Sequence, residues 1–125
     1  MSLLLYLAFT FLAPSTNHDT PSKLCLKGDV AREYCRSKGF NTSYCFLVNM
    51  GKHSGLKRFY IWDFKQHLAT DSGLVSHGCG NAPWSGDETK TNPVFSNTPD
   101  SHRSSLGKYK IGKRGYSNWG IHVNY

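Results

Sequence analysis

The sequence predicts a mainly β domain with one N-terminal helix, built on an incomplete mixed β-sheet or sandwich. Three observations favour this α+β class with little helix. The chain has 125 residues, which is one domain or a part of one. A helical spacing of apolar residues occurs only before residue 40, and short β-rich stretches separated by turn residues follow it.

The first 15 residues have the pattern of a signal peptide. Residues 3–13 are mostly apolar, too few to span a membrane, and Ala13 and Ser15 form a small-x-small cleavage site. This leader lacks a basic n-region. We expect it to direct export to the periplasm or cell wall, with no stable membrane span after its removal. The alternative is a buried helix or strand.

Residues 16–22 are polar and predict a linker, and residues 23–39 predict a helix. Asp29 can cap a turn, and Gly39 stands where a left-handed C-terminal cap is expected. The apolar face of this helix would carry Val30, Ala31, Tyr34 and Cys35.

The β core is expected over residues 44–125. Residues 44–50, 57–64 and 68–78 predict three strands joined by short turns, a meander. In the second strand, one face would carry Phe59, Ile61 and Asp63, and the other Tyr60 and Trp62. Strand character returns at residues 106–112 and 116–125.

A long loop rich in Gly, Pro, Asn and Ser is expected over residues 78–105. Loops of this length within a compact domain are usually functional or disordered. Trp84, Val94 and Phe95 favour an ordered loop that packs on the domain.

The four cysteines leave two interpretations open. An exported chain with an even cysteine count can form up to two disulfides. Cys35 and Cys45 lie in apolar patterns, where a buried free thiol is an equally good account. No CxxC spacing is present, so we expect no metal site and no cofactor.

His77 and Cys79 raise the question of a nucleophile. Residues two apart in a strand point to the same side, so a cysteine–histidine contact is possible at this spacing. The simpler interpretation is a glycine-rich turn that carries reactive side chains.

A wider pattern decides between these interpretations. From Asn49 to Tyr125 the chain resembles the murein L,D-transpeptidase catalytic domain family, of the YkuD-like type. The segments that carry the resemblance are RFYIWDF, GLVSHGCGN, FSNTPDSHRSSLGKY and YSNWGIHVNY. It implies an incomplete sheet or sandwich of the L,D-transpeptidase type, with the helix as its lead-in. It also implies a reaction on peptidoglycan stem peptides, in which a cysteine thiolate displaces the terminal D-alanine and an amine or water resolves the thioester.

The resemblance places the family's nucleophile in a later motif, a histidine followed by Ser-x-Gly-Cys. We interpret SHGCG as the upstream His-Gly turn, and the chain as an N-terminal portion that lacks the catalytic motif and is inactive alone. No catalytic residue is therefore assigned, whereas a set of residues is expected to shape the substrate cleft. These are His77, Gly78, Ser96, Asn97, Ser101, His102, Ser104, Ser105, Gly107, Tyr109, Tyr116 and His122.

The formal net charge of +7 suits an anionic partner. Residues after 99 include Arg103, Lys108, Lys110, Lys113 and Arg114. Export disfavours nucleic acid, so stem peptides are the expected partner. Two alternatives stay open: a non-catalytic, secreted, basic cell-wall-binding module, and a disulfide-stapled secreted protein unrelated to peptidoglycan.

Overall fold

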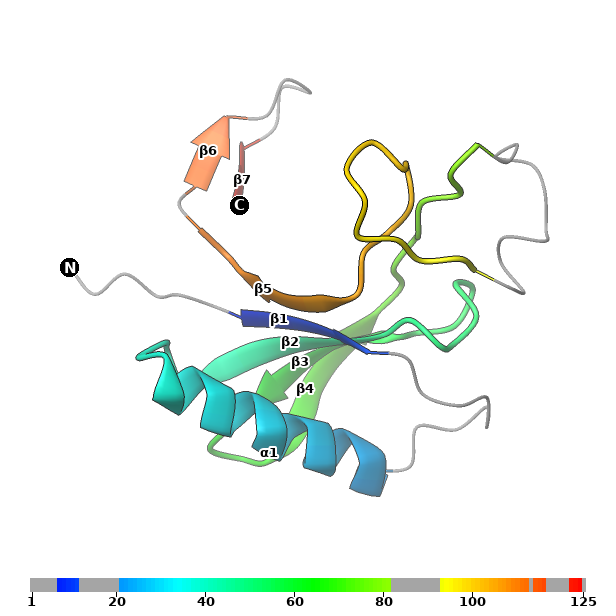
Figure 1. The fold of residues 1–125 in the computed structure, drawn as a ribbon. Coiled ribbons are helices and arrows are strands. Elements are labelled where there is room, and N and C mark those ends of the chain that lie inside the picture. Colours follow the sequence, from blue (N-terminus) through cyan, green and yellow to red (C-terminus); the bar gives the residue numbers. More distant parts are fainter. Residues whose placement is uncertain (1–6, 12–20, 82–92, 113, 117–121, 125) are drawn as a thin grey trace.

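A computed structural model describes residues 7–11, 21–81, 93–112, 114–116 and 122–124. In this part of the chain one helix covers one face of a five-stranded sheet, and two further short strands pair with each other (Figure 1). The elements are β1 (Leu7–Phe11), α1 (Pro21–Ser37), β2 (Tyr44–Asn49), β3 (Phe59–Asp63), β4 (Leu68–Gly73), β5 (Gly107–Lys110), β6 (Arg114–Tyr116) and β7 (His122–Asn124). The predicted fold class is confirmed.

The five-stranded sheet has the order β4-β3-β2-β1-β5. Strands β2, β3 and β4 pair antiparallel in chain order, so the predicted meander is confirmed. Strand β1 is parallel to β2, and the chain crosses between them through α1. Strand β5 pairs antiparallel with β1, which makes the sheet mixed.

Strand β1 comes from the apolar run that was expected to be a leader. Its residues lie between β2 and β5, with Ala8 opposite Phe46 on one side and Tyr109 on the other. In the structure the run therefore adopts a strand, the alternative that the sequence left open. Cleavage of residues 1–15 stays a prediction, as does a linker over 16–22, of which residues 16–20 lie outside the described residues.

The helix differs from its predicted bounds at both ends. It begins at Pro21, because proline is pre-organised for the first helical position and loses no hydrogen bond there. Asp29 lies in the middle of α1, so its predicted capping role is wrong. At the other end, Gly39 has φ 66°, and the N–H groups of Gly39 and Phe40 donate to the carbonyls of Arg36 and Cys35. This pair of hydrogen bonds is a Schellman cap, and it confirms the predicted role of Gly39.

The core lies between α1 and the sheet. The helix contributes side chains at a spacing of three to four residues, and β2 and β3 contribute every second residue. The buried cluster is Leu24, Ala31, Cys35, Cys45, Leu47, Tyr60, Trp62 and Phe64. Val30 was predicted on this face but is 56% exposed, because it lies on the far side of the helix from Ala31 and Cys35.

One glycine sets how closely the helix approaches the sheet. Gly28 is buried on α1, and a Cβ placed on it would lie 2.3 Å from two atoms of the Trp62 indole. Trp62 is only 1% exposed. The missing side chain at position 28 therefore lets the largest residue of β3 fit under the helix.

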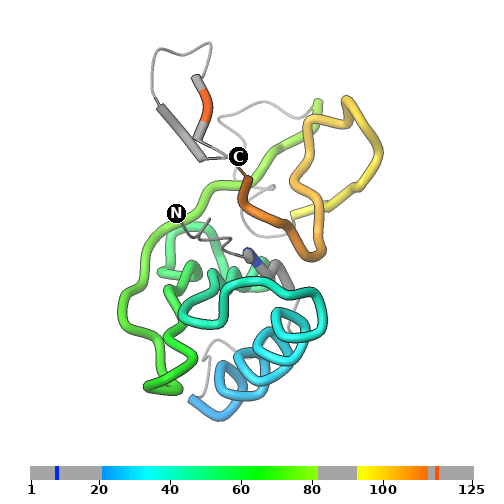
Figure 2. Tube along the Cα trace, turned by 90° about the vertical axis from the view of Figure 1, so that its left-hand side faces the viewer, coloured from blue at the N-terminus to red at the C-terminus, as the bar shows by residue number. Residues whose placement is uncertain are grey.

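Strand β4 is shorter than predicted. It ends at Gly73, whose carbonyl accepts from the N–H of Arg58, the residue that precedes β3. No residue of β3 is left to pair with residues 74–78, so the chain leaves the sheet edge there (Figure 2). The predicted strand over 116–125 is also corrected: Arg114–Tyr116 and His122–Asn124 form separate strands β6 and β7.

The turn from β3 to β4 is held by Asp63. Its carboxylate accepts from the N–H groups of Lys65 and Gln66, at 2.7 and 2.8 Å, and from the side-chain amide of Gln66. The backbone bond from Gln66 and those from Lys65 and the Tyr44 hydroxyl keep the pKa of Asp63 below its ordinary value. His67 then takes a positive φ of 57° and reaches Asp29 of α1 at 2.8 Å.

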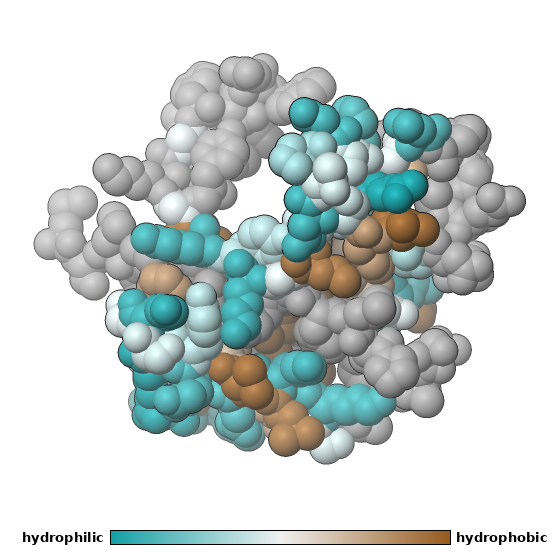
Figure 3. Space-filling model, viewed as in Figure 1, coloured by the Kyte–Doolittle hydropathy of each residue, from teal (hydrophilic) through white to brown (hydrophobic). Residues whose placement is uncertain are grey.

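On the face of the molecule in Figure 3, the helix and the loop are mostly hydrophilic, with an apolar strip across the helix and further apolar residues below the loop. No helix among the described residues is long and apolar enough to cross a membrane.

Replacing Gly28 with alanine should destabilise the fold by about 1–3 kcal/mol, because the new methyl group overpacks the Trp62 indole. Helix propensity alone predicts the opposite, a gain of roughly 0.5–1 kcal/mol. Urea denaturation followed by Trp fluorescence measures the difference. Val30→Ala, at an exposed position of the same helix, is the control and should change stability by less than about 0.5 kcal/mol. A Gly28→Ala variant as stable as the parent would contradict the close approach.

Asp63→Asn should lower the Tm at neutral pH, and the deficit should shrink as the pH falls. The pKa of Asp63 is lowered by folding, so its stabilisation is complete above its ordinary pKa of 3.8 and is lost as the pH drops through the folded value. Thermal unfolding of both proteins between pH 2 and 7 checks this. A Tm difference that does not change with pH would show that the charge of Asp63 is not involved.

Candidate functional site

Two glycine- and serine-rich segments meet on the side of the sheet opposite the helix. Residues 77–80 follow the end of β4, and residues 101–104 belong to the loop that leads into β5. Figures 1 and 2 both show these segments beside each other. Cys79 forms an isolated antiparallel bridge with Arg103, which fixes their register.

Glycine is required where the segments touch. The N–H of Gly78 donates to Ser104 Oγ at 3.0 Å, and the N–H of Gly80 donates to the carbonyl of His102 at 3.0 Å. A Cβ on Gly78 would lie 2.3 Å from the same His102 oxygen. Gly80 has φ 66°, a conformation that side chains disfavour. The HGCG sequence therefore allows two backbones to pack without side chains between them.

The tip of the loop is a tight turn with two strained residues. The N–H of Ser101 donates to the carbonyl of Thr98, and Pro99 occupies the second turn position. Asp100 and His102 have φ values of 58° and 53°, in the left-handed region that aspartate and histidine tolerate better than most residues.

Side chains of the loop divide into two groups by what they bind. Ser96 and Ser101 accept from N–H groups two residues ahead, which is ordinary turn chemistry. Asn97 instead holds both polar groups of Leu106, donating to its carbonyl and accepting from its N–H. Ser104 reaches Gly78, 26 residues away in sequence. Asn97 and Ser104 thus close the loop and attach it to the end of β4.

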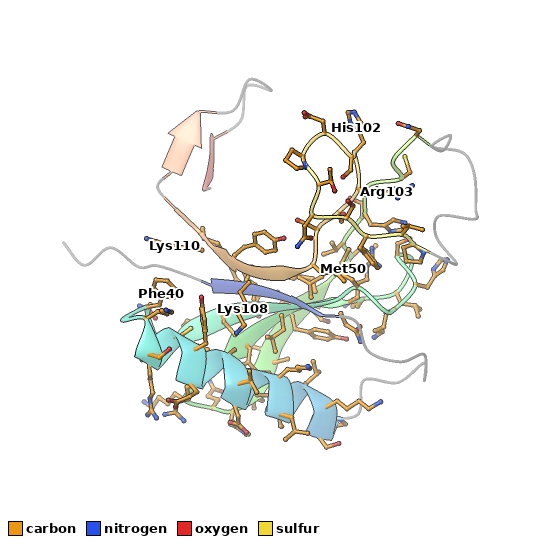
Figure 4. All side chains as sticks on the ribbon, in the orientation of Figure 1. Phe40, Met50, His102, Arg103, Lys108 and Lys110 are labelled. Carbon is orange, nitrogen blue, oxygen red and sulfur yellow. The ribbon has the colours of Figure 1, made fainter. Side chains whose placement is uncertain are left out.

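A shallow, open hollow of about 240 Å³ lies over the loop. Its lining is polar and carries both signs of charge. The lining residues are Ser96, Asn97, Thr98, Pro99, Asp100, Ser101, His102, Arg103 and Ser105. Five of the residues predicted for the cleft are brought together here, and Figure 4 shows His102 and Arg103 on this loop, away from the helix.

Gly78 contacts the loop at Ser104 and His102, whereas His77 is not among the residues that line the hollow. The remaining predicted residues follow the loop in the sequence. Gly107 begins β5, and the hydroxyl of Tyr109 donates to Ser105. Tyr116 in β6 pairs with His122 in β7. The side chains of these last two lie outside the described residues, so their predicted cleft role stays a prediction.

His77 is held by a residue that sequence reasoning missed. The guanidinium of Arg58 donates from Nη2 to His77 Nδ1 at 3.1 Å, and from Nε and Nη2 to the carbonyl of Val75 at 2.9 and 2.7 Å. Its Nη1 donates to the carbonyl of Lys52 at 2.8 Å. Arg58 is fully buried, and burial lowers its pKa.

Cys79 shows no feature of an activated nucleophile. Its sulfur lies 3.9 Å from the carbonyl of Gly80, and the backbone N–H groups on either side of it are already bound to Ser104 and His102. An oxyanion hole needs such donors to be free for the substrate. Residues 76–79 do spell Ser-x-Gly-Cys. The resemblance places the nucleophile motif after the FSNTPDSHRSSLGKY segment, whereas residues 76–79 precede it, so we do not identify this tetrapeptide with the family's motif.

The other cysteines are free thiols, and two of them are buried. Burial raises the pKa of Cys45 to about 12, with a contribution from neighbouring Cys35, whose own pKa is raised by burial. Both remain protonated and unreactive in the core, as the buried-thiol interpretation expected. No group of three or more His, Cys, Asp or Glu among the described residues is placed to hold a metal ion.

Of the three aromatic or apolar residues that suggested an ordered loop, Phe95 is half-buried and Val94 is exposed. Trp84 lies outside the described residues. Arg58 and Arg103 lie in segments that carry the resemblance, but they were not predicted as cleft residues. A further clue to Arg58 was that it precedes an apolar strand, where a buried charge must find partners.

A family model described as L,D-transpeptidase catalytic domain matches residues 21–125. No curated protein and no solved structure matches the chain.

Gly78→Ala should separate the two segments, because its methyl group would overlap the carbonyl oxygen of His102. We expect a loss of about 1–3 kcal/mol in stability and changed amide NMR shifts at residues 101–104. Gly73→Ala is the matched control, since its Cβ would make only an ordinary 3.7 Å contact with Phe59. Unchanged shifts at 101–104 in the Gly78→Ala variant would contradict the close packing.

Proposed function

Because the chain belongs to the L,D-transpeptidase catalytic domain family, we propose that it binds peptidoglycan stem peptides in the hollow formed by residues 96–105. The family match supports a transpeptidase-like function acting on these peptides. The observation that favours this hollow as the binding site is the closed conformation of the loop. Asn97 and Ser104 hold it by long-range hydrogen bonds, and a polar hollow opens over it.

The lining suits a peptide with charged ends. Arg103 can pair with a carboxylate, Asp100 can pair with an amine, and the serine hydroxyls can bind amide groups. A stem peptide carries all three kinds of group. We include export in the proposal, because the substrate lies outside the cytoplasm.

We further propose that no cysteine of this chain attacks the stem peptide to form a thioester. In the family reaction a thiolate attacks the amide next to the terminal D-alanine, D-alanine leaves, and an amine or water releases the thioester. Cys79 would need a histidine base and free oxyanion donors. The N–H groups that flank it are occupied, and His77 is bound to Arg58, which supports the assignment of the nucleophile to another motif.

A basic cell-wall-binding role is the second candidate. It is favoured by Lys108 and Lys110, which are exposed on the edge strand β5 and lie over the rings of Tyr34 and Phe40, at 4.1 and 5.8 Å (Figure 4). Such a surface would hold an anionic wall polymer by salt-sensitive attraction.

Titration of the ¹⁵N-labelled chain with a stem tetrapeptide should shift the amides of residues 96–105 and leave those of residues 52–56 unchanged. Asn97→Ala frees the loop from Leu106 and should weaken binding roughly 2–10-fold, the range expected for loss of about one net hydrogen bond. Val30→Ala, on the far side of the sheet, is the matched control. Binding that moves only the amides of β5 and α1, and vanishes at high salt, would favour the wall-polymer role.

Incubation with a carbapenem-type β-lactam should leave the intact mass of the chain unchanged, because no activated thiol is present. An L,D-transpeptidase with a working nucleophile, treated in parallel, shows that the reagent is active. A single adduct that disappears in a Cys79→Ser variant would identify Cys79 as a nucleophile and overturn the non-acylating assignment.

A further inference from the structure

The guanidinium of Arg103 is unpaired among the residues that the structure describes. Arg103 is exposed and lines the hollow, and its backbone N–H donates to Ser101 Oγ. No described residue accepts a hydrogen bond from its side chain. Asp100 lines the same hollow three residues earlier, yet these two described residues form no ion pair. The positive charge of Arg103 is therefore available to an anion that enters the hollow.

The position of Arg103 is set by the segment on which it packs. The bridge between Cys79 and Arg103 fixes their register, and the N–H of Gly80 donates to the carbonyl of His102 at 3.0 Å. The arginine side chain then runs over Gly80, because a Cβ on this glycine would lie 2.8 Å from Arg103 Nε and 3.3 Å from its Cγ. This contact restricts the conformations that the side chain can adopt, so less entropy is lost when its planar guanidinium binds a ligand.

The size of the hollow limits which part of a ligand it can hold. Its volume of about 240 Å³ is below the roughly 300–1,000 Å³ of sites that enclose a drug-sized molecule. A whole tetrapeptide does not fit, so one end or a short part of it enters while the rest leaves through the open side. A chain end with a free carboxylate brings a full negative charge to Arg103, whereas an internal peptide group brings none.

We propose that Arg103 is a specificity-determining residue that binds the free carboxylate at the C-terminal end of a stem peptide. This inference rests on the proposed function and deepens it, because it states which end of the peptide enters the hollow. Two N–H groups of one guanidinium can bind both oxygens of a carboxylate at once, a geometry that the ammonium group of a lysine does not provide.

A cycle of two peptides and two proteins tests this role. A stem tetrapeptide with a free C-terminal carboxylate is compared with the same peptide as its C-terminal amide, by NMR titration of the ¹⁵N-labelled chain. The parent protein should bind the amide roughly 5–10-fold more weakly, slightly more than an exposed ion pair gives, because two N–H groups hold the carboxylate. Arg103→Gln should bind both peptides equally, with the affinity that the parent shows for the amide.

Arg36→Gln is the matched control, because it removes an exposed arginine from α1, on the other side of the sheet. It should keep the parent's preference for the free carboxylate. Arg103→Lys keeps the charge without the paired N–H donors and should retain only a part of the preference.

Two results would overturn the proposal. One is an Arg103→Gln variant that prefers the free carboxylate by the same factor as the parent. The other is a loss of affinity in this variant that is equal for the two peptides, since Arg103 would then bind a different carboxylate of the stem or only support the loop. Unchanged amide shifts in β2 and β3 verify that the variant is folded.

Triglycine and its C-terminal amide separate this inference from the proposed function. If the stem tetrapeptide shifts no amide of the hollow, but the parent prefers triglycine to its amide and Arg103→Gln does not, the carboxylate role stands and the stem-peptide proposal is wrong. If the stem tetrapeptide binds in the hollow without any preference for the free carboxylate, the stem-peptide proposal stands and the role of Arg103 is wrong.

Discussion

The buried guanidinium of Arg58 is the constraint on which the rest of the site depends. Arg58 directly precedes β3. Its guanidinium donates to the carbonyl of Lys52 in the turn that follows β2, and to Val75 and His77 in the segment that follows β4. Because a buried cation cannot be left without acceptors, these segments must converge on it. These bonds fix the position of the HGCG segment, and the loop of residues 96–106 packs against it.

The helix–sheet layer depends on a different constraint, the absence of a side chain at Gly28. This gap accommodates the Trp62 indole and lets α1 lie close to β2 and β3. Trp62 and Tyr60 point toward the helix, whereas Phe59 faces the other way, against Phe46 with ring centroids 5.2 Å apart. A packed sheet is a suitable base for a loop that must keep its shape.

Strand β1 links these two parts in an unexpected way. It is the only described neighbour of β5 in the sheet, and β5 carries the end of the cleft loop. The apolar run that the sequence suggests as a leader thus lies, in the structure, between β2 and β5 and connects β5 to the rest of the sheet. Apolar runs of this length have the composition of either a leader or a buried strand, so composition alone does not predict which strands would pair with one.

The sequence by itself determined the fold class, the β2–β3–β4 meander, the Gly39 cap and the position of residues 96–105 in a loop before β5. Local periodicity and turn chemistry specify all of these, because each depends on neighbours within a few residues. Only the tertiary structure decided that Asp29 is not a cap, that β4 stops at Gly73, and that β1 pairs with β2 and β5. Only the tertiary structure also showed that Arg58 forms a hydrogen bond with His77, 19 residues away. The physical reason is the same in each case: the partner that satisfies a buried polar group or strand edge lies far off in sequence, and no local pattern records it.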